Sequence, residues 1–250
     1  MIGWAIGLPA LRVGLVLVVN LITWALLRAA GQPVGFPVVA LSALLLFPVN
    51  VASLMLLRRR LHREGRRLRD LVGLSRGRLP RDLLWGLLWF VVLQAGFGAA
   101  LFAVMAIRYG SDMTTAFATI FVDTATAVAW PPWLMITLFV ITVITFAPLN
   151  APAEELIYRG YAQTELATRL PTWLAIGIPA ALFALQHLFF APTAAAMPVF
   201  GIAFAVWAVG AGLILHRQRR LVPLIFAHLL VNLVTTVPTL LVVLMFSQGS

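Results

Sequence analysis

The sequence predicts an all-α membrane protein, a polytopic bundle of seven or eight transmembrane helices. Of the 250 residues, 62% are hydrophobic and only 10% are charged, and the mean hydropathy is +1.00. A soluble domain of this length carries about a quarter charged residues. Apolar stretches of roughly 20 residues, the length that an α-helix needs to cross a bilayer, recur along the chain. These observations predict the fold class.

Seven apolar stretches are long enough to be transmembrane helices, and proline, glycine or charged residues lie between them. They cover residues 9–28, 36–57, 82–107, 132–149, 172–191, 196–215 and 222–246. Residues 152–169 continue with helical spacing, either as an eighth helix or as a segment that dips into the inner leaflet. No internal repeat divides the chain, so residues 1–250 are expected to form a single membrane domain.

The basic residues point to a membrane surface. The net charge is +10, all 18 basic side chains are arginines, and ten of them lie in residues 58–81. Because basic loops stay in the cytoplasm, this segment is expected to be a cytoplasmic loop lying on the membrane. Anionic lipid headgroups would attract it there. The same placement argues against nucleic acid as a partner, although a soluble protein of this charge would suggest one.

The arginines also set the orientation. With a cytoplasmic N-terminus, only Arg28 and Arg108 lie at the outer side of the membrane, whereas the opposite orientation places the ten-arginine loop outside. The protein is therefore expected in the plasma or inner membrane, as a multi-pass protein. The outer loop 108–131 predicts a short amphipathic helix, because apolar residues recur in it at helical spacing. These residues are Met113, Phe117, Ile120, Phe121 and Val128.

One charged stretch lies between the apolar runs. Residues 151–161, APAEELIYRGY, contain Glu154, Glu155 and Arg159. Pro152 suits the first turn of a new helix, where carboxylates complement the helix dipole. Glu155 and Arg159 are four residues apart and can pair on one helix face. Glu154 is turned by about 100° from Glu155, so it can point into the bundle. Taken alone, the stretch is explained equally well by a functional role and by a surface ion pair with a carboxylate that caps the helix.

Two further polar groups lie within predicted membrane helices. His187 lies in the span 172–191, and His228 and Asn232 share one face of the last span. A lone histidine in such a helix can simply hydrogen-bond a neighbouring helix. Ionisable groups in membrane segments cost about 2.5–3.5 kcal/mol on insertion scales, which makes function their default explanation. Together with Glu154 they are the residue types that activate a water molecule and stabilise an oxyanion.

The same side chains also permit a metal site. Two histidines and one carboxylate, with a fourth position open, are ligands that zinc accepts. Here they would be Glu154, His187 and His228. No HExxH helix requires a metal, however, so a zinc cofactor stays open. His62 and His216 lie in basic loops and are not expected to be ligands.

In this order, the three motifs resemble the CPBP family of intramembrane proteases, which includes type II CAAX prenyl endopeptidases and bacteriocin-processing proteins. The family patterns EExxxR, FxxxH and HxxxN read here Glu154-Glu155-Leu-Ile-Tyr-Arg159, Phe183-Ala-Leu-Gln-His187 and His228-Leu-Leu-Val-Asn232. Tyr158 departs mildly from the family's usual phenylalanine. The resemblance covers residues 148–235, and the first three spans match only as generic membrane helices. It implies that Glu155 and Arg159 position the motif helix.

The resemblance implies an endopeptidase that hydrolyses a membrane-associated peptide or protein at the cytoplasmic side. Glu154 and His187 would hold and deprotonate the attacking water. His228 and Asn232 would stabilise the oxyanion. We favour this glutamate-activated water over a metal. Two other classes of protein remain as alternatives: a transporter, which usually shows inverted repeats, and a non-catalytic scaffold, which has no need of all four polar residues.

Overall fold

The structure, a computed structural model, is a bundle of helices. It describes residues 2–38, 41–121 and 131–247, and every regular element in these ranges is helical. The long helices are α1 (Ile2–Ala29), α2 (Ser42–Arg63), α4 (Leu79–Tyr109), α6 (Pro132–Glu154), α8 (Thr172–His187), α9 (Met197–Gln218) and α10 (Val222–Ser247). The short ones are α3 (Leu68–Val72), α5 (Met113–Phe121) and α7 (Thr164–Leu166). The prediction of an all-α membrane helix bundle is confirmed.

Several of these helices have the length and composition of transmembrane helices. Among the described residues, five segments are long and apolar enough to cross a membrane: Ile2–Ala29, Leu68–Phe121, Trp133–Leu166, Thr172–Phe190 and Ala194–Gln218. Val222–Val237, in α10, is apolar but shorter. The sequence predicted seven or eight spans, and the remaining predicted span, 36–57, corresponds to α2. This helix begins and ends later than predicted, so its last turns carry arginines.

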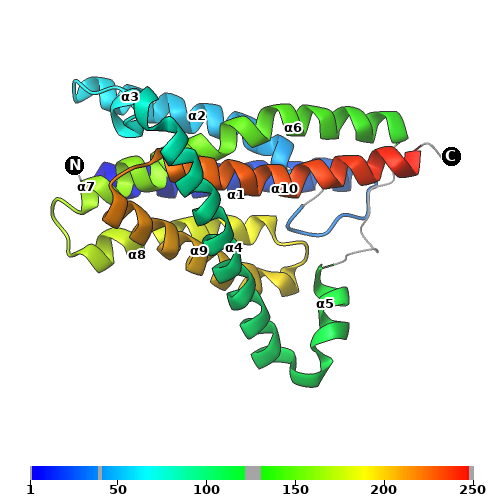
Figure 1. Cartoon of the computed structure of the whole chain (residues 1–250). Helices are drawn as coiled ribbons and strands as arrows, with labels where there is room; N and C mark the ends of the chain where they lie inside the picture. The colour runs from blue at the N-terminus through cyan, green and yellow to red at the C-terminus, as the bar shows by residue number, and fades with distance from the viewer. Residues whose placement is uncertain (1, 39–40, 122–130, 248–250) are drawn as a thin grey trace.

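The long helices pack around α10 and α8. Helix α10 contacts α6 on one side and α4 on the other, α8 contacts α9 and α1, and α2 contacts α6. Figure 1 shows α4 crossing the other helices and then extending away from them, with α5 folding back beside its end. This arrangement brings α6, α8 and α10, which carry the three motifs, into one bundle.

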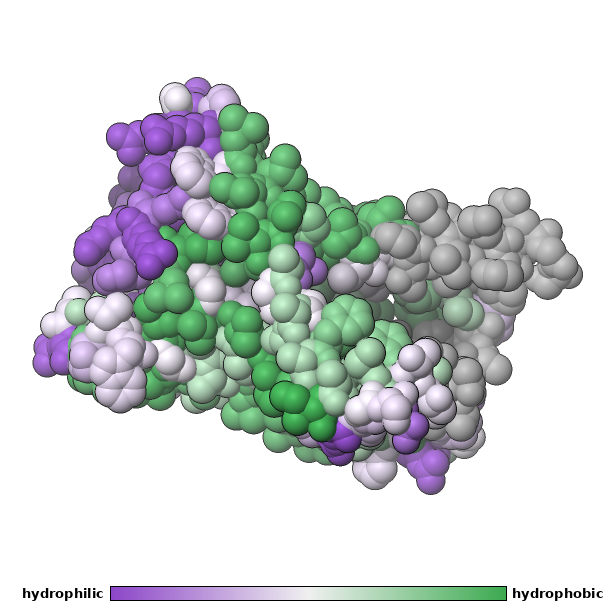
Figure 2. Space-filling model, turned by 60° about the horizontal axis from the view of Figure 1, so that its bottom comes forward, coloured by the Kyte–Doolittle hydropathy of each residue, from purple (hydrophilic) through white to green (hydrophobic). Residues whose placement is uncertain are grey.

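Polar and apolar surfaces separate along the bundle. In Figure 1 the N-terminal end of α1, the helices α3 and α7, and the connection between α9 and α10 lie at one end of the molecule. Helix α5 lies away from that end. Figure 2 shows apolar side chains over the middle of one face, with hydrophilic residues gathered mainly at one end. The segments that were predicted to share the cytoplasmic side are thus at the same end of the protein.

The motif segment corrects one prediction. Pro152 was expected to begin a new helix, but it lies inside α6, as does Pro148. The chain continues from α6 into a π-helix, Glu155–Gln163, and then into α7 without a break. Proline removes a helical hydrogen bond. Membrane helices tolerate this where neighbouring helices and local changes of winding satisfy the freed backbone groups. A π-helix, with its wider winding, is such a change, and π-bulges within α-helices are frequent at functional sites.

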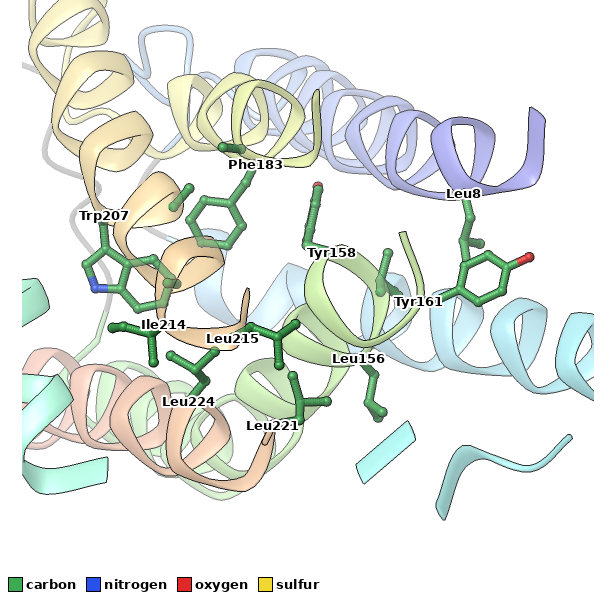
Figure 3. Packing of buried hydrophobic residues seen from close by; sticks show 14 of the residues in the cluster. Leu8, Leu156, Tyr158, Tyr161, Phe183, Trp207, Ile214, Leu215, Leu221 and Leu224 are labelled. Carbon is green, nitrogen blue, oxygen red and sulfur yellow. The ribbon is translucent and has the colours of Figure 1, made fainter. Parts of the chain in front are cut away.

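The π-helix lies in the centre of the apolar core. All of the residues 155–163 are buried, and the segment contacts α1, α2, α8 and α9. Figure 3 shows how the side chains of α8, α9 and α10 surround it. Tyr158 packs edge-on against Phe183 of α8, with ring centroids 5.3 Å apart. Because every neighbour of this segment is a packed helix, its side chains are held in fixed positions.

The basic segment 58–81 is partly structured and contacts the core. Its first residues complete α2, and α3 follows after a turn. Arg60 pairs with Glu64 at 2.7 Å and also donates to the hydroxyl of Tyr161 at 3.2 Å. Arg66 pairs with Glu165 at 2.5 Å. Some of the arginines therefore fix this segment to the buried motif helix.

The predicted amphipathic helix corresponds to α5. Ile120 is buried on this helix and packs with Met105 of α4 and Val199 of α9. Its polar residues, including Thr115, are exposed. Val128, which was predicted to extend the apolar face, lies outside the described residues.

Candidate active site

A cavity of about 440 Å³ brings the predicted site residues together. Its polar lining includes Glu154 at the end of α6, His187 at the end of α8, and His228 and Asn232 on α10. Most of the remaining lining is apolar, and it includes Phe146 and other residues of several helices. Residues that are as many as 78 positions apart in the chain, 154 and 232, thus meet at one place.

The two oxygens of Glu154 have different surroundings. The side chain is fully buried. Its Oε1 accepts hydrogen bonds from Arg12 at 2.8 Å and from Gln186 at 2.7 Å. Its Oε2 has no hydrogen-bond partner among the described residues and lies 3.6 Å from Nε2 of His228. One oxygen is therefore held by the protein, and the other is free to bind a molecule in the cavity.

His187 presents one defined nitrogen to the cavity. Its Nδ1 lies 2.7 Å from the carbonyl oxygen of Phe183. A carbonyl only accepts hydrogen bonds, so Nδ1 carries the proton and Nε2 of the neutral ring has a free lone pair. The imidazole stacks on Phe204, with ring centroids 3.8 Å apart and an interplanar angle of 21°. The carbonyl and the stacked ring together fix its orientation.

His228 is oriented by Glu155. Its Nδ1 lies 2.9 Å from Oε1 of Glu155, which also accepts a hydrogen bond from Arg159 at 3.2 Å. The structure thus forms the predicted ion pair of Glu155 and Arg159, and it lies in the core rather than at the surface. The surface alternative that the sequence left open does not apply. Because Nδ1–H donates to this carboxylate, Nε2 of His228 is left on the side of Glu154, at 3.6 Å from its Oε2.

Aromatic rings enclose the guanidinium of Arg159. Its Cζ lies 4.4 Å from the ring centroid of Phe183, 5.2 Å from Trp207 and 5.9 Å from Tyr158. Faces of aromatic rings attract cations, and more strongly where water is excluded. The cage holds the charge that neutralises Glu155, and so it supports the position of His228.

Asn232 supplies a free donor. It follows His228 by four residues on α10 and lies on the same side of the cavity. Within the described part of the chain, its Nδ2 has no hydrogen-bond partner, although the side chain is only 4% exposed. A buried and unpaired donor is costly unless it serves a ligand or a reacting group.

Sequence reasoning missed Arg12 and the polar residues around it. The predicted span 9–28 placed Arg12 near the membrane boundary, but α1 begins at Ile2, and Arg12 is only 1% exposed. The signal in the sequence was an arginine inside a mostly apolar stretch. Gln186, the residue before His187, also contacts Glu154 directly, at 2.7 Å.

The described residues do not fit a zinc ion as they are placed. Among them, no three histidine, aspartate or glutamate side chains are grouped so that they could hold a metal. Arg12 also occupies Oε1 of Glu154 at 2.8 Å. A guanidinium at this distance repels a metal cation and competes with it for the carboxylate. The proposed ligand set of Glu154, His187 and His228 is therefore not arranged for zinc, and no step below runs through a metal.

The other histidines lie outside this site. His62 and His216 are both exposed, but they lie in the last turns of α2 and α9 rather than in the basic loops that the sequence predicted. Neither lines the cavity of the candidate site. His216 is therefore a suitable control position, because its substitution changes a histidine without changing the site.

The segment that carries the site is similar to a known protein family. Residues 129–234 match the family described as Rce1-like, type II CAAX prenyl endopeptidase. No curated protein and no solved structure matches the chain. The matched segment contains all three motifs and begins before the region 148–235 on which the sequence resemblance rested. Over residues 129–234, the chain is therefore similar to the Rce1-like type II CAAX prenyl endopeptidases, in agreement with the resemblance that the three motifs indicated.

Proposed function

We propose that the protein hydrolyses a peptide bond of a membrane-associated peptide or protein, with Glu154 as the general base. One observation carries this proposal: Oε2 of Glu154 is buried, unpaired within the described chain, and faces a cavity that His187, His228 and Asn232 also line. A carboxylate, an imidazole lone pair and a free amide donor in one cavity are the groups that acyl transfer to water requires.

The attacking water is held by Glu154 and His187. Water donates one hydrogen bond to Oε2 of Glu154 and the other to Nε2 of His187, which has a lone pair in this tautomer. As the water oxygen attacks the carbonyl carbon of the substrate, Oε2 takes the proton. Glu154 then gives this proton to the leaving nitrogen as the C–N bond breaks, which leaves a carboxylic acid and an amine.

The oxyanion is stabilised from α10. The free N–H of Asn232 donates to the oxygen that becomes negative during the attack, and Nε2 of His228 donates to it when it is protonated. Glu154 and Glu155 lie 3.6 Å and 2.9 Å from the two ring nitrogens of this histidine and hold it beside the cavity. Donors that are already oriented in a site without bulk water stabilise such charge most strongly.

The cavity lining and the basic segment indicate the kind of substrate and the orientation of the protein in the membrane. The apolar lining favours substrates whose residues around the cleaved bond are apolar, as in a membrane-associated segment. We propose that the N-terminus and the active-site side are cytoplasmic, in a plasma or inner membrane, because the positive-inside rule assigns the ten arginines of residues 58–81 to the cytoplasm. Those arginines that are exposed would bind anionic lipid headgroups.

The test is cleavage by the purified protein in detergent. A library of apolar peptides is incubated with the wild type, and the products are identified by mass spectrometry. Glu154→Gln should reduce cleavage at least about 10²-fold, which is the lower end for the loss of a general base. His216→Gln is the control, since this exposed residue lies outside the cavity, and it should cleave like the wild type. A folded Glu154→Gln protein with unchanged cleavage contradicts the proposal.

A second arm of this experiment tests the metal alternative. If Glu154 activates water without a metal, cleavage should persist after dialysis against a strong chelator. Bound metal is measured in the same samples by elemental analysis. Loss of cleavage that added zinc restores, together with about one zinc per chain before dialysis, would establish the metal mechanism instead.

A further inference from the structure

Arg12 lies deep in the bundle and contacts three other helices. Its guanidinium donates to Gln186 of α8, to Asn50 and Ser53 of α2, and to Asn150 and Glu154 of α6. The shortest of these contacts are those of Nη2 with Asn50 at 2.7 Å and with Glu154 at 2.8 Å. The side chain is 1% exposed, in a helix whose residues are mostly apolar.

Burying an arginine between helices has a high cost in desolvation free energy. Apolar residues of similar volume often stabilise a protein as well as a buried ion pair does or better. Charged residues inside membrane segments are accordingly rare and usually functional. Arg12 therefore needs an explanation beyond packing, and its contact with Glu154 supplies one.

The guanidinium holds Glu154 in two ways. It binds Oε1 directly, and its Nε donates to Oε1 of Gln186 at 3.1 Å. Tyr158 donates to the same amide oxygen at 2.9 Å. With its oxygen bound twice, Gln186 turns its NH₂ group toward Glu154, to which it donates at 2.7 Å. Both hydrogen bonds on Oε1 thus depend on Arg12, and Oε2 is left toward the cavity.

The charges are separated into two pairs. Arg12 pairs with Glu154, whereas Arg159 pairs with Glu155 and is held by its aromatic cage. Among the described residues, no other arginine forms an ion pair with Glu154. The cation that stabilises the proposed base therefore comes from α1, outside the segment 129–234 that matches the family.

We propose that Arg12 is a positioning residue for the reaction, which fixes Oε1 of Glu154 and so directs Oε2 to the attacking water. This inference rests on the proposed function. Arg12 touches no reacting atom, and it acts through Glu154 and Gln186. Its loss should therefore slow the chemical step more than it weakens substrate binding.

The experiment compares Arg12→Gln and Arg12→Lys with the wild type, using a peptide that the wild type cleaves. Arg12→Gln should lower kcat at least about tenfold with KM nearly unchanged, the pattern of an interaction lost in the transition state. Arg12→Lys keeps the charge but not the fork of donors, so it should recover part of kcat. Arg28→Gln is the matched control, because Arg28 lies exposed at the end of the same helix. It should leave kcat and KM unchanged.

A double substitution separates positioning from a merely structural role. If Arg12 acts through Glu154, the protein with Arg12→Gln and Glu154→Gln should cleave no more slowly than Glu154→Gln alone. Melting temperatures in detergent identify the folded variants. If Arg12→Gln does not fold, Arg12→Lys carries the test, with reduced kcat at unchanged KM as the expected result.

Two outcomes overturn the inference while the proposed function stands. In the first, the wild type cleaves and a folded Arg12→Gln or Arg12→Lys protein has wild-type kcat. In the second, the effects of Arg12→Gln and Glu154→Gln multiply in the double variant, so that Arg12 acts independently of the base. If the wild type cleaves no peptide, the proposed function fails and the role of Arg12 fails with it.

Discussion

Glu154 and Glu155 are neighbours in the chain, yet each binds a different cation. Glu154 pairs with Arg12 of α1, and Glu155 pairs with Arg159 one turn later in its own segment. The rotation between successive helical residues makes this division possible. It leaves Glu154 with an oxygen toward the cavity, whereas Glu155 accepts the hydrogen bond from Nδ1 of His228. Two like charges can thus be buried side by side, each with a partner of its own.

This division predicts different results for the two glutamates. Glu155→Gln and Arg159→Met each leave one buried charge unpaired, which in other proteins costs about 3–5 kcal/mol. Both single variants should therefore melt at lower temperature in detergent. The double variant removes both charges and should recover part of the stability, but not the activity, because His228 loses the carboxylate on Nδ1. If the fall in melting temperature of the double variant equals the sum of the falls of the two single variants, the two charges do not stabilise each other.

The site residues could be predicted in part from the sequence. Glu154, His187, His228 and Asn232 were found because polar groups at fixed spacings are conspicuous in apolar helices. Arg12 was not, since its predicted span began at residue 9 and so placed it near the boundary. A span's start is hard to locate from hydropathy where apolar residues continue on both sides. The partners of a buried arginine come from other helices, and no local pattern identifies them.

At the scale of elements, close helix contacts hold the motif helices in place. Helix α10, which carries His228 and Asn232, lies against α4 at Gly86. A Cβ atom on Gly86 would be 2.7 Å from Cδ1 of Phe226 and 2.8 Å from the backbone oxygen of Pro223. The backbone oxygen has little freedom to move away. Small residues allow such close approach of membrane helices.

Gly86→Ala should therefore destabilise the protein. Overpacking typically costs about 1–3 kcal/mol, and this corresponds to a fall of several degrees in melting temperature for a chain of this size. Cleavage should fall as well, because α10 shifts with the contact. Gly98→Ala, on the same helix, is the control, since a Cβ at Gly98 meets no atom within 4 Å. Equal melting temperatures of Gly86→Ala and Gly98→Ala would show that the close approach of α4 and α10 at Gly86 does not stabilise the protein.

The π-helix is the element that the sequence predicted least well. Pro152 and the acidic residues after it are typical of a helix start, so a new helix was expected there. The described chain instead continues from α6 through Glu155–Gln163 to α7. The winding is set by the surrounding helices, which bury every side chain of this segment. Local propensity does not contain that information, because it comes from tertiary packing.

At the scale of the whole molecule, composition and charge were sufficient for the fold class but not for the arrangement of helices. The apolar stretches predicted a membrane bundle, and the described chain is one. The contacts of α1 with α8 and of α10 with α6 join segments that are distant in sequence. Such contacts create the cavity. The first helices, generic by their sequence, supply Arg12, Asn50 and Ser53 to the environment of the site.

The orientation of this bundle in the membrane is the last prediction. The arginines of residues 58–81 predict that this segment is cytoplasmic, and helix α5 lies away from that end of the protein (Figure 1). Because the chain has no cysteine, one introduced cysteine reports on one position. On intact cells, a membrane-impermeant maleimide should label Thr115→Cys in α5, whose side chain is exposed. Ser75→Cys, within the basic segment, should react only after the membrane is permeabilised. The opposite labelling pattern would reverse the orientation and would place the proposed cleavage on the outer side of the membrane.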